Sequence, residues 1–364
     1  MSEPVTLPAV PARSPVRTPE QAPAVGYHSG VWLIWVTGVL IVLTTGRNPW
    51  YITATLLAIS VVTVQVGGAA EGQNRPAVID PWRFGLFAVV MGALFNGLTV
   101  RVGETVLFAV PSWIPLLGGP VTLEALVFGA LNGLVLAGLF AAFSVLNQML
   151  PIRSLIRMIP RAFYPVAVVM AIAVTYIPST VTQIGQVREA QAVRGNRMQG
   201  LRSWLPLFLP LLVGGIERSL QLAEAMTARG FAAGENADSR QPRAWGVAGL
   251  AAIVAGWLLQ LVWRQPLWGG VLLLAGGLLL LAALRRAGRA HRHTVYRPER
   301  WRWVDLPPLA GVAIAVAVMI APLPWVDRMA LMYYPYPLLT WPTVDWTVMI
   351  GLCGLALPAI KPAD

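Results

Sequence analysis

Charged residues are scarce in this chain of 364 residues: Asp, Glu, Lys and Arg make up 12% of it, whereas hydrophobic residues make up 56%. A soluble globular protein carries roughly 25% charged residues, and the mean hydropathy here is +0.64. A transmembrane helix needs about 20 mostly apolar residues. The composition therefore excludes an ordinary soluble protein and predicts an all-α, polytopic helical membrane protein.

The residues that usually hold metals or perform catalysis are also few. Cys353 is the one cysteine, which excludes an intramolecular disulfide and a cysteine metal site. His291 and His293 lie among arginines that would repel a cation, and the carboxylates are too isolated to hold magnesium as a pair. The phosphate-binding pattern G-x-x-x-x-G-K-[ST] does not occur. We therefore expect no metal site and no cofactor, and a non-catalytic chain that is not its own ATPase.

The positive charge is concentrated in two places. The net charge is +11, with 11 arginines between residues 151 and 243 and seven between residues 285 and 302. Basic residues gather in this way in the cytoplasmic loops of membrane proteins. No stacking aromatics accompany a basic groove, so we expect no binding to nucleic acid. The expected partner is the lipid bilayer.

These patterns divide the sequence into four segments. Residues 1–30 are rich in proline and include Arg13 and Arg17, which predicts a disordered cytoplasmic tail. Residues 31–150 are expected to form N-terminal transmembrane helices, and residues 151–243 a cytoplasmic coupling domain. Residues 244–364 are expected to form C-terminal transmembrane helices with a basic cytoplasmic loop at residues 285–302.

The cytoplasmic position of residues 151–243 follows from charge and length. Arginines flank the apolar run Phe163–Ser179 on both sides, so both flanks favour the cytoplasm. The next run, Trp204–Ile216, has 13 residues, which span about 20 Å of helix against a hydrocarbon core of about 30 Å. A re-entrant pair of helices is the alternative. Prolines also make residues 101–120 fit an interfacial or re-entrant stretch better than a straight helix.

The dipeptide Arg-Gly ends two amphipathic runs, and its arginines, Arg194 and Arg229, are 35 residues apart. An arginine in the last turn suits the helix dipole, and glycine suits the left-handed cap. Two copies with small and acidic neighbours further predict a protein interface, because a guanidinium binds carboxylates or carbonyls in a bidentate way. The predicted coupling residues are Ala192, Val193, Arg194, Gly195, Ala228, Arg229 and Gly230, supported along their helices by Glu189, Gln191, Glu217, Gln221 and Glu224.

These residues resemble the paired Ala-Arg-Gly signature of the transmembrane T component of energy-coupling factor transporters, a family that includes cobalt-transport permease-like proteins. Ala228-Arg229-Gly230 matches fully, whereas Val193-Arg194-Gly195 has valine in place of alanine. The likeness is strongest from about Thr122 to Ala232 and does not account for the helices after Leu284. The two extra methyl groups of Val193 are expected to crowd a close approach by a partner.

The resemblance implies a scaffold in the cytoplasmic membrane of a bacterium or archaeon. It would join two ABC ATPase subunits to a substrate-binding membrane S component for vitamin or transition-metal uptake, with Arg194 and Arg229 each seated in a groove of one ATPase. Two alternatives stay open. A conventional ABC importer permease would carry the substrate path itself, and a membrane-embedded transferase would use the basic loop at residues 285–302 to bind an anionic headgroup.

Overall fold

The computed structural model describes residues 26–70, 80–111, 118–195, 204–231, 240–290, 299–321 and 323–360. The predicted tail at residues 1–30 therefore lies mostly outside the described residues, as do residues 291–298 of the basic loop at residues 285–302. Within the described ranges, six helices are long and apolar enough to cross a membrane. This confirms the all-α, polytopic fold.

By its internal contacts the chain forms two compact units. The first unit joins Met1–Pro151 to Glu299–Asp364, and the second is Ile152–Pro298. The segment expected at residues 244–364 therefore contributes two helices to each of the two units. The elements of the first unit are α1 (Ser29–Thr45), α2 (Pro49–Ala70), α3 (Pro81–Thr99), β1 (Val106–Val110), β2 (Gly119–Thr122), α4 (Leu123–Met149), the 3-10 helix η3 (Trp303–Asp305), α10 (Leu306–Ile320), the 3-10 helix η4 (Met329–Leu331), α11 (Trp346–Cys353) and the 3-10 helix η5 (Gly354–Ala359).

The core of the first unit joins the two ends of the sequence. Trp32 and Trp35 of α1 are among its largest fully buried side chains, and the indole N–H of Trp35 donates to the Leu355 carbonyl oxygen at 2.8 Å. Gly38 leaves room for Val312 of α10, whose Cγ1 would lie only 2.3 Å from a Cβ at position 38. Close packing of these large side chains stabilises the unit through van der Waals contact.

Small residues bring α3 and α4 into close contact. A Cβ on Gly133 of α4 would lie 2.5 Å from the Ala88 carbonyl oxygen of α3, and one on Gly92 would lie 2.6 Å from the Gly129 carbonyl oxygen. Asn96 of α3 also donates to the Ala125 carbonyl oxygen at 2.6 Å. Close backbone approach and interhelical hydrogen bonds hold helices together in membranes, where burial from water contributes little.

The strands β1 and β2 pair antiparallel within and just after the stretch 101–120, where the sequence analysis expected an interfacial or re-entrant stretch. Val110 pairs with Gly119 and Val106 with Thr122. The buried carboxylate of Glu124 holds the start of the hairpin, because its Oε1 accepts the Thr105 N–H at 3.1 Å. Prolines exclude a regular helix here, and the pairing satisfies backbone groups that a helix would otherwise satisfy.

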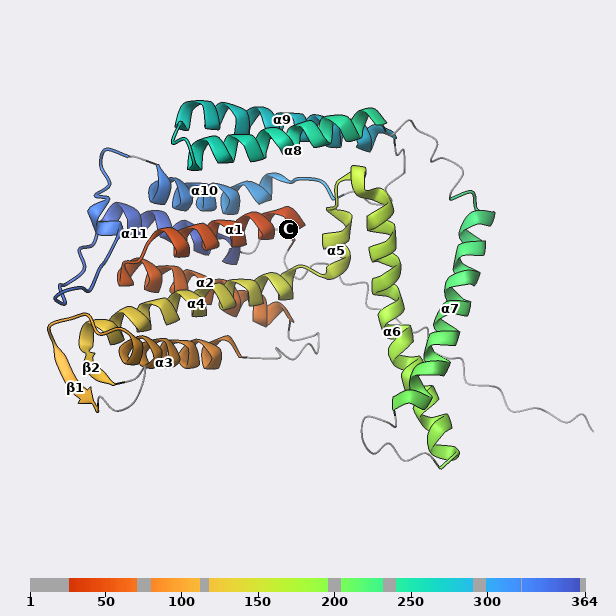
Figure 1. Cartoon of the computed structure of the whole chain (residues 1–364), viewed down its shortest axis with the longest axis horizontal. Coiled ribbons are helices and arrows are strands. Elements are labelled where there is room, and N and C mark those ends of the chain that lie inside the picture. The colour runs from red at the N-terminus through yellow and green to blue at the C-terminus, as the bar shows by residue number, and fades with distance from the viewer. Residues whose placement is uncertain are drawn as a thin grey trace, which may run out of the picture. The chain divides into compact units, whose positions relative to one another are not determined.

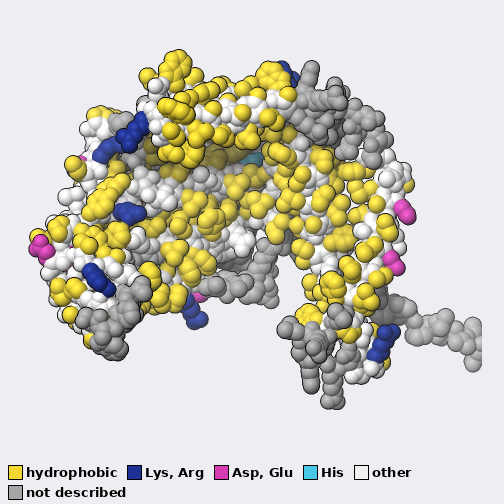
Figure 2. Space-filling view, viewed as in Figure 1, with side chains coloured by type: hydrophobic (Ala, Val, Ile, Leu, Met, Phe, Trp, Pro, Cys, Tyr) yellow, Lys and Arg dark blue, Asp and Glu magenta, His cyan; other side chains and the backbone are white. Residues whose placement is uncertain are grey.

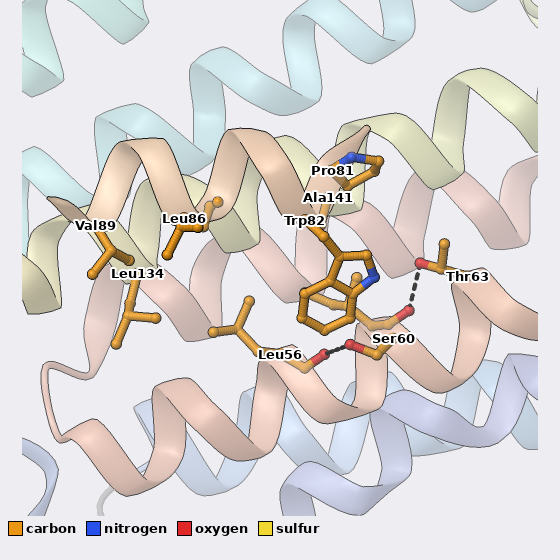
Figure 3. Close-up of a pocket in the computed structure, with 12 residues that line it drawn as sticks. Leu56, Ser60, Thr63, Pro81, Trp82, Leu86, Val89, Leu134 and Ala141 are labelled. Atoms are coloured by element: carbon orange, nitrogen blue, oxygen red, sulfur yellow. Dashed lines mark hydrogen bonds between the residues drawn. The ribbon is translucent and has the colours of Figure 1, made fainter. Parts of the chain in front are cut away.

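An apolar cavity of about 350 Å³ lies among α2, α3 and α4 (Figure 3). Trp82 of α3 covers it, and Leu134 and Ala141 of α4 line it. The hydroxyls of Ser60 and Thr63 point back to their own helix and donate to the Leu56 and Ile59 carbonyl oxygens at 2.6 and 2.8 Å. The cavity therefore offers an almost entirely apolar lining.

The second unit contains two pairs of long helices (Figure 1). The helix α6 runs through Pro178 for 30 residues, and α7 runs through Pro210 for 24 residues, so both extend beyond the apolar runs seen in the sequence. By length and hydropathy alone, residues 161–193 suit a membrane crossing. The elements of this unit are α5 (Ile152–Arg157), the 3-10 helix η1 (Arg161–Phe163), α6 (Tyr164–Val193), α7 (Leu205–Ala228), α8 (Arg240–Leu261) and α9 (Pro266–Ala290).

The helices α8 and α9 form a hairpin with a glycine interface. A Cβ on Gly276 would lie 2.8 Å from the Gly249 carbonyl oxygen, and one on Gly269 would lie 2.9 Å from the Gly256 carbonyl oxygen. Hydrophobic side chains cover most of the visible surface of this pair (Figure 2). That surface suits contact with lipid or with another membrane helix.

Candidate functional site

The first Arg-Gly copy lies where α6 ends. Arg194 is the C-cap residue, and Gly195 follows in the left-handed region with φ +78. The Gly195 N–H donates to the Ala192 carbonyl oxygen at 3.0 Å, and the Arg194 N–H donates to the Ala190 carbonyl oxygen at 3.4 Å. The glycine thus closes the helix and leaves the arginine as its last residue, as the sequence pattern predicts.

The second copy ends α7 in the same way, with both hydrogen bonds of a complete helix cap. Arg229 is the C-cap residue, and Gly230 has φ +76. The Gly230 N–H donates to the Thr227 carbonyl oxygen at 2.9 Å, and the Phe231 N–H donates to the Met226 carbonyl oxygen at 3.0 Å. These two bonds form a Schellman motif, in which a left-handed glycine satisfies the last carbonyl groups of a helix.

Both helix ends are open to solvent. Arg194 and Arg229 are exposed, and within the described residues neither side chain has a hydrogen bond or ion pair. Val193 is 90% exposed, so no described residue of its own unit crowds it, and the expected crowding against a partner stays a prediction. An arginine that projects from a helix end retains all its donors for another molecule.

The supporting residues lie along the same two helices. Gln191 is half-buried and donates to the Pro206 carbonyl oxygen of α7 at 3.4 Å. The other eleven predicted residues are exposed: Glu189, Ala192, Val193, Arg194, Gly195, Glu217, Gln221, Glu224, Ala228, Arg229 and Gly230.

The structure places the two arginines far apart, because α6 and α7 are antiparallel (Figure 1). Gln191 near the end of α6 contacts Pro206 near the start of α7. The Tyr164 ring at the start of α6 lies 6.3 Å from the Phe231 ring beyond the end of α7. A helix rises 1.5 Å per residue, so a pair of this length separates its two ends by about 36 Å. Two ends at that distance fit two separate binding grooves.

One polar cluster between the helices was missed by the sequence analysis. Arg218 of α7 donates to the Gln183 Oε1 at 3.0 Å and to the Ser179 hydroxyl oxygen at 3.3 Å, both on α6. Its guanidinium carbon also lies 5.8 Å from the centre of the Tyr176 ring. The only available signal was an arginine in the middle of a largely apolar helix.

The apolar face of α7 is not buried within the described residues of the unit. Its large apolar side chains recur at helical spacing on one face, and Glu217, Gln221 and Glu224 form a polar stripe on another. An exposed apolar face of this size marks a protein or membrane contact. The exposed side chains are Phe208, Leu209, Leu212, Val213, Ile216 and Leu220.

Other clusters of reactive groups offer no stronger candidate. In the ranges that the structure describes, no three His, Cys, Asp or Glu residues come together in a way that could hold a metal ion. Glu124 is fully buried, and its Oε2 has no hydrogen-bond partner, but its Oε1 holds the hairpin. The two Arg-Gly helix ends are therefore the candidate functional site.

Comparison with known proteins identifies the family of the chain. Residues 26–240, more than half of the chain, match the family model CbiQ, described as cobalt transport protein. That range contains both Arg-Gly copies and ends at the first residue of α8, so α8, α9, α10 and α11 lie beyond it.

Individual relatives are bacterial. The energy-coupling factor transporter transmembrane protein EcfT 1 of Listeria monocytogenes is 26% identical over 208 residues, which are 52% of this chain and 73% of that protein. The EcfT protein of Thermosediminibacter oceani is 33% identical over 117 residues, 30% of this chain and 44% of the relative. That of Bacillus subtilis is 24% identical over 170 residues, 45% of this chain and 56% of the relative. The chain thus spans about three quarters of the first relative and about half of the other two.

The apolar helices and the family match show that the protein is a multi-pass cell membrane protein. The chain belongs to the CbiQ family, as an EcfT/CbiQ-like transmembrane T component.

Proposed function

We propose that this chain is the coupling subunit of an energy-coupling factor importer. Two ABC ATPase subunits bind the Arg194 and Arg229 ends, and their ATP-driven motion passes through α6 and α7 to a substrate-binding membrane S component. The imported substrate is a vitamin or a transition-metal ion, and the chain itself performs no catalysis. The observation that carries the proposal is the position of two exposed, glycine-capped arginines at opposite ends of one antiparallel pair.

The chemistry of the helix ends supports a groove as the binding partner. A guanidinium is planar and presents five N–H donors, which match carboxylates and backbone carbonyls at the bottom of a groove. Ala192 and Ala228, which are small and exposed, allow the partner's backbone to approach each arginine closely. Glu189 and Glu224 lie one turn back and are exposed, so they offer further contacts at the rim.

The apolar face of α7 supports contact with the membrane S component. It lies on the helix that also carries Arg229, and Phe208, Leu212 and Ile216 are exposed along it. A partner with an apolar surface would bury these side chains at roughly 25 cal/mol per Å². Movement of the Arg229 end would then be transmitted directly to that partner.

We place residues 151–243 on the cytoplasmic side of the membrane, where the ATPases are. The 11 arginines of this segment support the placement, because basic segments remain in the cytoplasm. A cysteine introduced at Ala190, after Cys353→Ser, tests it. A membrane-impermeant maleimide should label that cysteine in inside-out vesicles and not in intact spheroplasts. Labelling from the outer side alone would contradict the placement.

The coupling role is tested by alanine substitution of the two arginines. The full chain carries an affinity tag and is purified from its native cells. Arg194→Ala or Arg229→Ala alone should reduce the amount of co-purified ATPase several-fold, and the double variant should remove nearly all of it. Arg83→Ala is the matched control, because Arg83 lies in the first unit and its side chain is 89% exposed.

The outcome separates the coupling role from a general loss of positive charge. If the double variant retained the ATPases in normal amount, the proposal would be wrong. Arg194→Lys and Arg229→Lys keep the charge but lose the bidentate geometry, so they should also weaken association. Substrate bound tightly by this chain in the absence of an S component would instead favour a conventional permease.

A further inference from the structure

Arg218 connects the middle of α7 to α6 with contacts on both sides of a proline. Tyr176, under the guanidinium, precedes Pro178, whereas the two hydrogen-bond acceptors, Ser179 and Gln183, follow it. Pro178 lies inside α6 and has no N–H to donate to the carbonyl four residues earlier, so the helix is weakened at this point. The part of α6 after the proline is the part that ends in Arg194.

The Gln183 side chain fits tightly against α7. Its Oε1 accepts from Arg218, and a Cβ on Gly214 would lie 2.7 Å from its Nε2. Gly214 thus leaves the space in which the Gln183 amide lies flat against the helix. The neighbouring Gly215 is different, because nothing lies within 4 Å of a Cβ at that position.

Polar side chains around Arg218 form an open depression with it. Thr175, Tyr176, Ser179, Thr182, Gln183, Gln186 and Arg218 line it. The Ser179 hydroxyl also donates to the Tyr176 carbonyl oxygen at 2.8 Å. Arg218 therefore binds a Ser179 hydroxyl that is itself oriented by the α6 backbone next to Pro178.

We infer that Arg218 is a positioning residue that fixes the last part of α6 to α7, so that the Arg194 and Arg229 ends move as one body. This inference rests on the proposed coupling function. Pro178 weakens α6, so without the Arg218 contact the Arg194 end turns more freely relative to α7, where the hydrogen bond from Gln191 to the Pro206 carbonyl oxygen still remains. Motion of the ATPase at the Arg194 end would then be absorbed by bending of α6 at Pro178 and would not reach α7.

The test compares two adjacent glycine substitutions that are chemically identical. Gly214→Ala displaces the Gln183 amide, which is the flexible end of a side chain, whereas Gly215→Ala enters open space. Both changes raise helix propensity equally. Arg218→Met removes the hydrogen bonds and the charge, and Gly214→Ala serves as the milder variant if Arg218→Met fails to fold.

The readout is the distance between spin labels on the two helices in the full chain. After Cys353→Ser, cysteines at the exposed positions Ala190 and Ala225 carry the labels, which lie about 30 Å apart by helix rise. The parent chain and Gly215→Ala should give the same narrow distance distribution by pulsed EPR. Gly214→Ala and Arg218→Met should broaden it at least twofold.

The same variants are then measured in the complex with co-purified ATPases, in the presence of ATP and orthovanadate. Gly214→Ala and Arg218→Met should retain the ATPases and hydrolyse ATP, but the nucleotide should no longer produce one uniform distance. An unchanged narrow distribution in both variants would overturn the inference, as would equal broadening in Gly215→Ala. Failure of the coupling proposal itself would give a different result, because the double variant Arg194→Ala, Arg229→Ala would then retain the ATPases.

Discussion

Gly195 and Gly230 hold each arginine at a helix end through their backbone conformation alone. Both have a positive φ, +78 and +76, and among the described residues nothing lies within 4 Å of a Cβ at either position. A side chain there meets no obstacle in space but strains the backbone, which costs about 1 kcal/mol or more. Glycine at these positions thus determines where each helix stops and in which direction its arginine leaves.

Gly230→Ala should therefore weaken the end of α7 without disturbing any packing. The strain of about 1 kcal/mol should appear as roughly fivefold weaker ATPase association. Hydrogen exchange at the Phe231 amide, which is bonded to the Met226 carbonyl oxygen at 3.0 Å, should become faster. Gly230→Asn is the matched control, because asparagine adopts the left-handed region more readily. Equal losses in both variants would show that the left-handed conformation is not what matters.

Asp345 is a second residue whose role can be tested, in the first unit. Its Oδ1 accepts the Thr347 N–H at 2.8 Å and caps α11, while its Oδ2 accepts the Asp327 N–H at 3.1 Å. Burial alone would raise the pKa of Asp345, but these N–H donors outweigh it and hold the pKa below its ordinary value of 3.8. The depressed pKa means that the carboxylate stabilises the fold above pH 3.8 and loses this effect as the pH falls through the folded-state value.

Asp345→Ala should accordingly lower the free energy of unfolding by about 1 kcal/mol at neutral pH. The difference from the parent chain should stay constant down to about pH 4 and shrink below it. Thermal unfolding in detergent at a series of pH values measures this. Asp80→Ala is the comparison, because Asp80 caps α3 through a single N–H, that of Trp82 at 3.1 Å, and should cost less. A difference that grew in acid would contradict the assigned role.

At the scale of elements, pairs of helices are held by glycines that face each other. In the α8–α9 hairpin a Cβ on Gly276 would lie 2.7 Å from the Ile253 Cγ1 and 2.8 Å from the Gly249 carbonyl oxygen. Backbone atoms cannot move aside as a flexible side chain can. Gly277, the next residue, has nothing within 4 Å of its own Cβ.

Gly276→Ala should separate α8 from α9 and destabilise the hairpin by about 1–3 kcal/mol. Gly277→Ala should be neutral or slightly stabilising, because alanine favours helix over glycine by about 1 kcal/mol. Limited proteolysis at the turn around Arg264, compared between the two variants, reports the opening of the hairpin. Equal protection of both variants would mean that close packing does not hold these helices together.

Much of this element-level structure is readable from the sequence, and the exceptions have a physical reason. Apolar runs mark most of the helices, and the Arg-Gly pattern marks the ends of α6 and α7, because propensity and capping are local. Arg218 gives no such signal, since its acceptors lie 35 and 39 residues away on another helix. The β1–β2 hairpin was also missed, because its register depends on pairing across six residues outside the described ranges and on Glu124.

For the whole molecule, the first unit is built from distant parts of the chain. Helix α10 packs on α1, and the backbone N–H of His28 donates to the Asp305 Oδ1 at 2.9 Å across 277 residues. No local pattern predicts such pairing. The sequence analysis therefore treated residues 244–364 as one segment, whereas the contacts assign α8 and α9 to the second unit and α10 and α11 to the first. The helices α10 and α11, which lie beyond the family match, are therefore part of the core of the first unit and not an appendage.

Removal of residues 299–364 should consequently prevent the first unit from folding. It would expose Trp32 and Trp35, which are at most 1% exposed in the full chain, and leave the Trp35 indole N–H without its acceptor. The truncated chain should be degraded and not accumulate in the membrane. Co-expression of residues 299–364 as a separate fragment should restore accumulation. A chain that ends after Ile360 retains the described contacts and is the control.

An antiparallel pair of helices has an approximate twofold axis perpendicular to its length, and the pair α6–α7 has one near the Arg218 cluster. Dimers commonly have a twofold axis as well. Under the proposed coupling function, one copy of this chain would present equivalent contacts to both halves of an ATPase dimer, which sets the expected stoichiometry at one T component for two ATPases. Val193 and Ala228 break that symmetry. Two different ATPases would consequently have a preferred orientation on the chain, and two identical ones would be held with unequal strength.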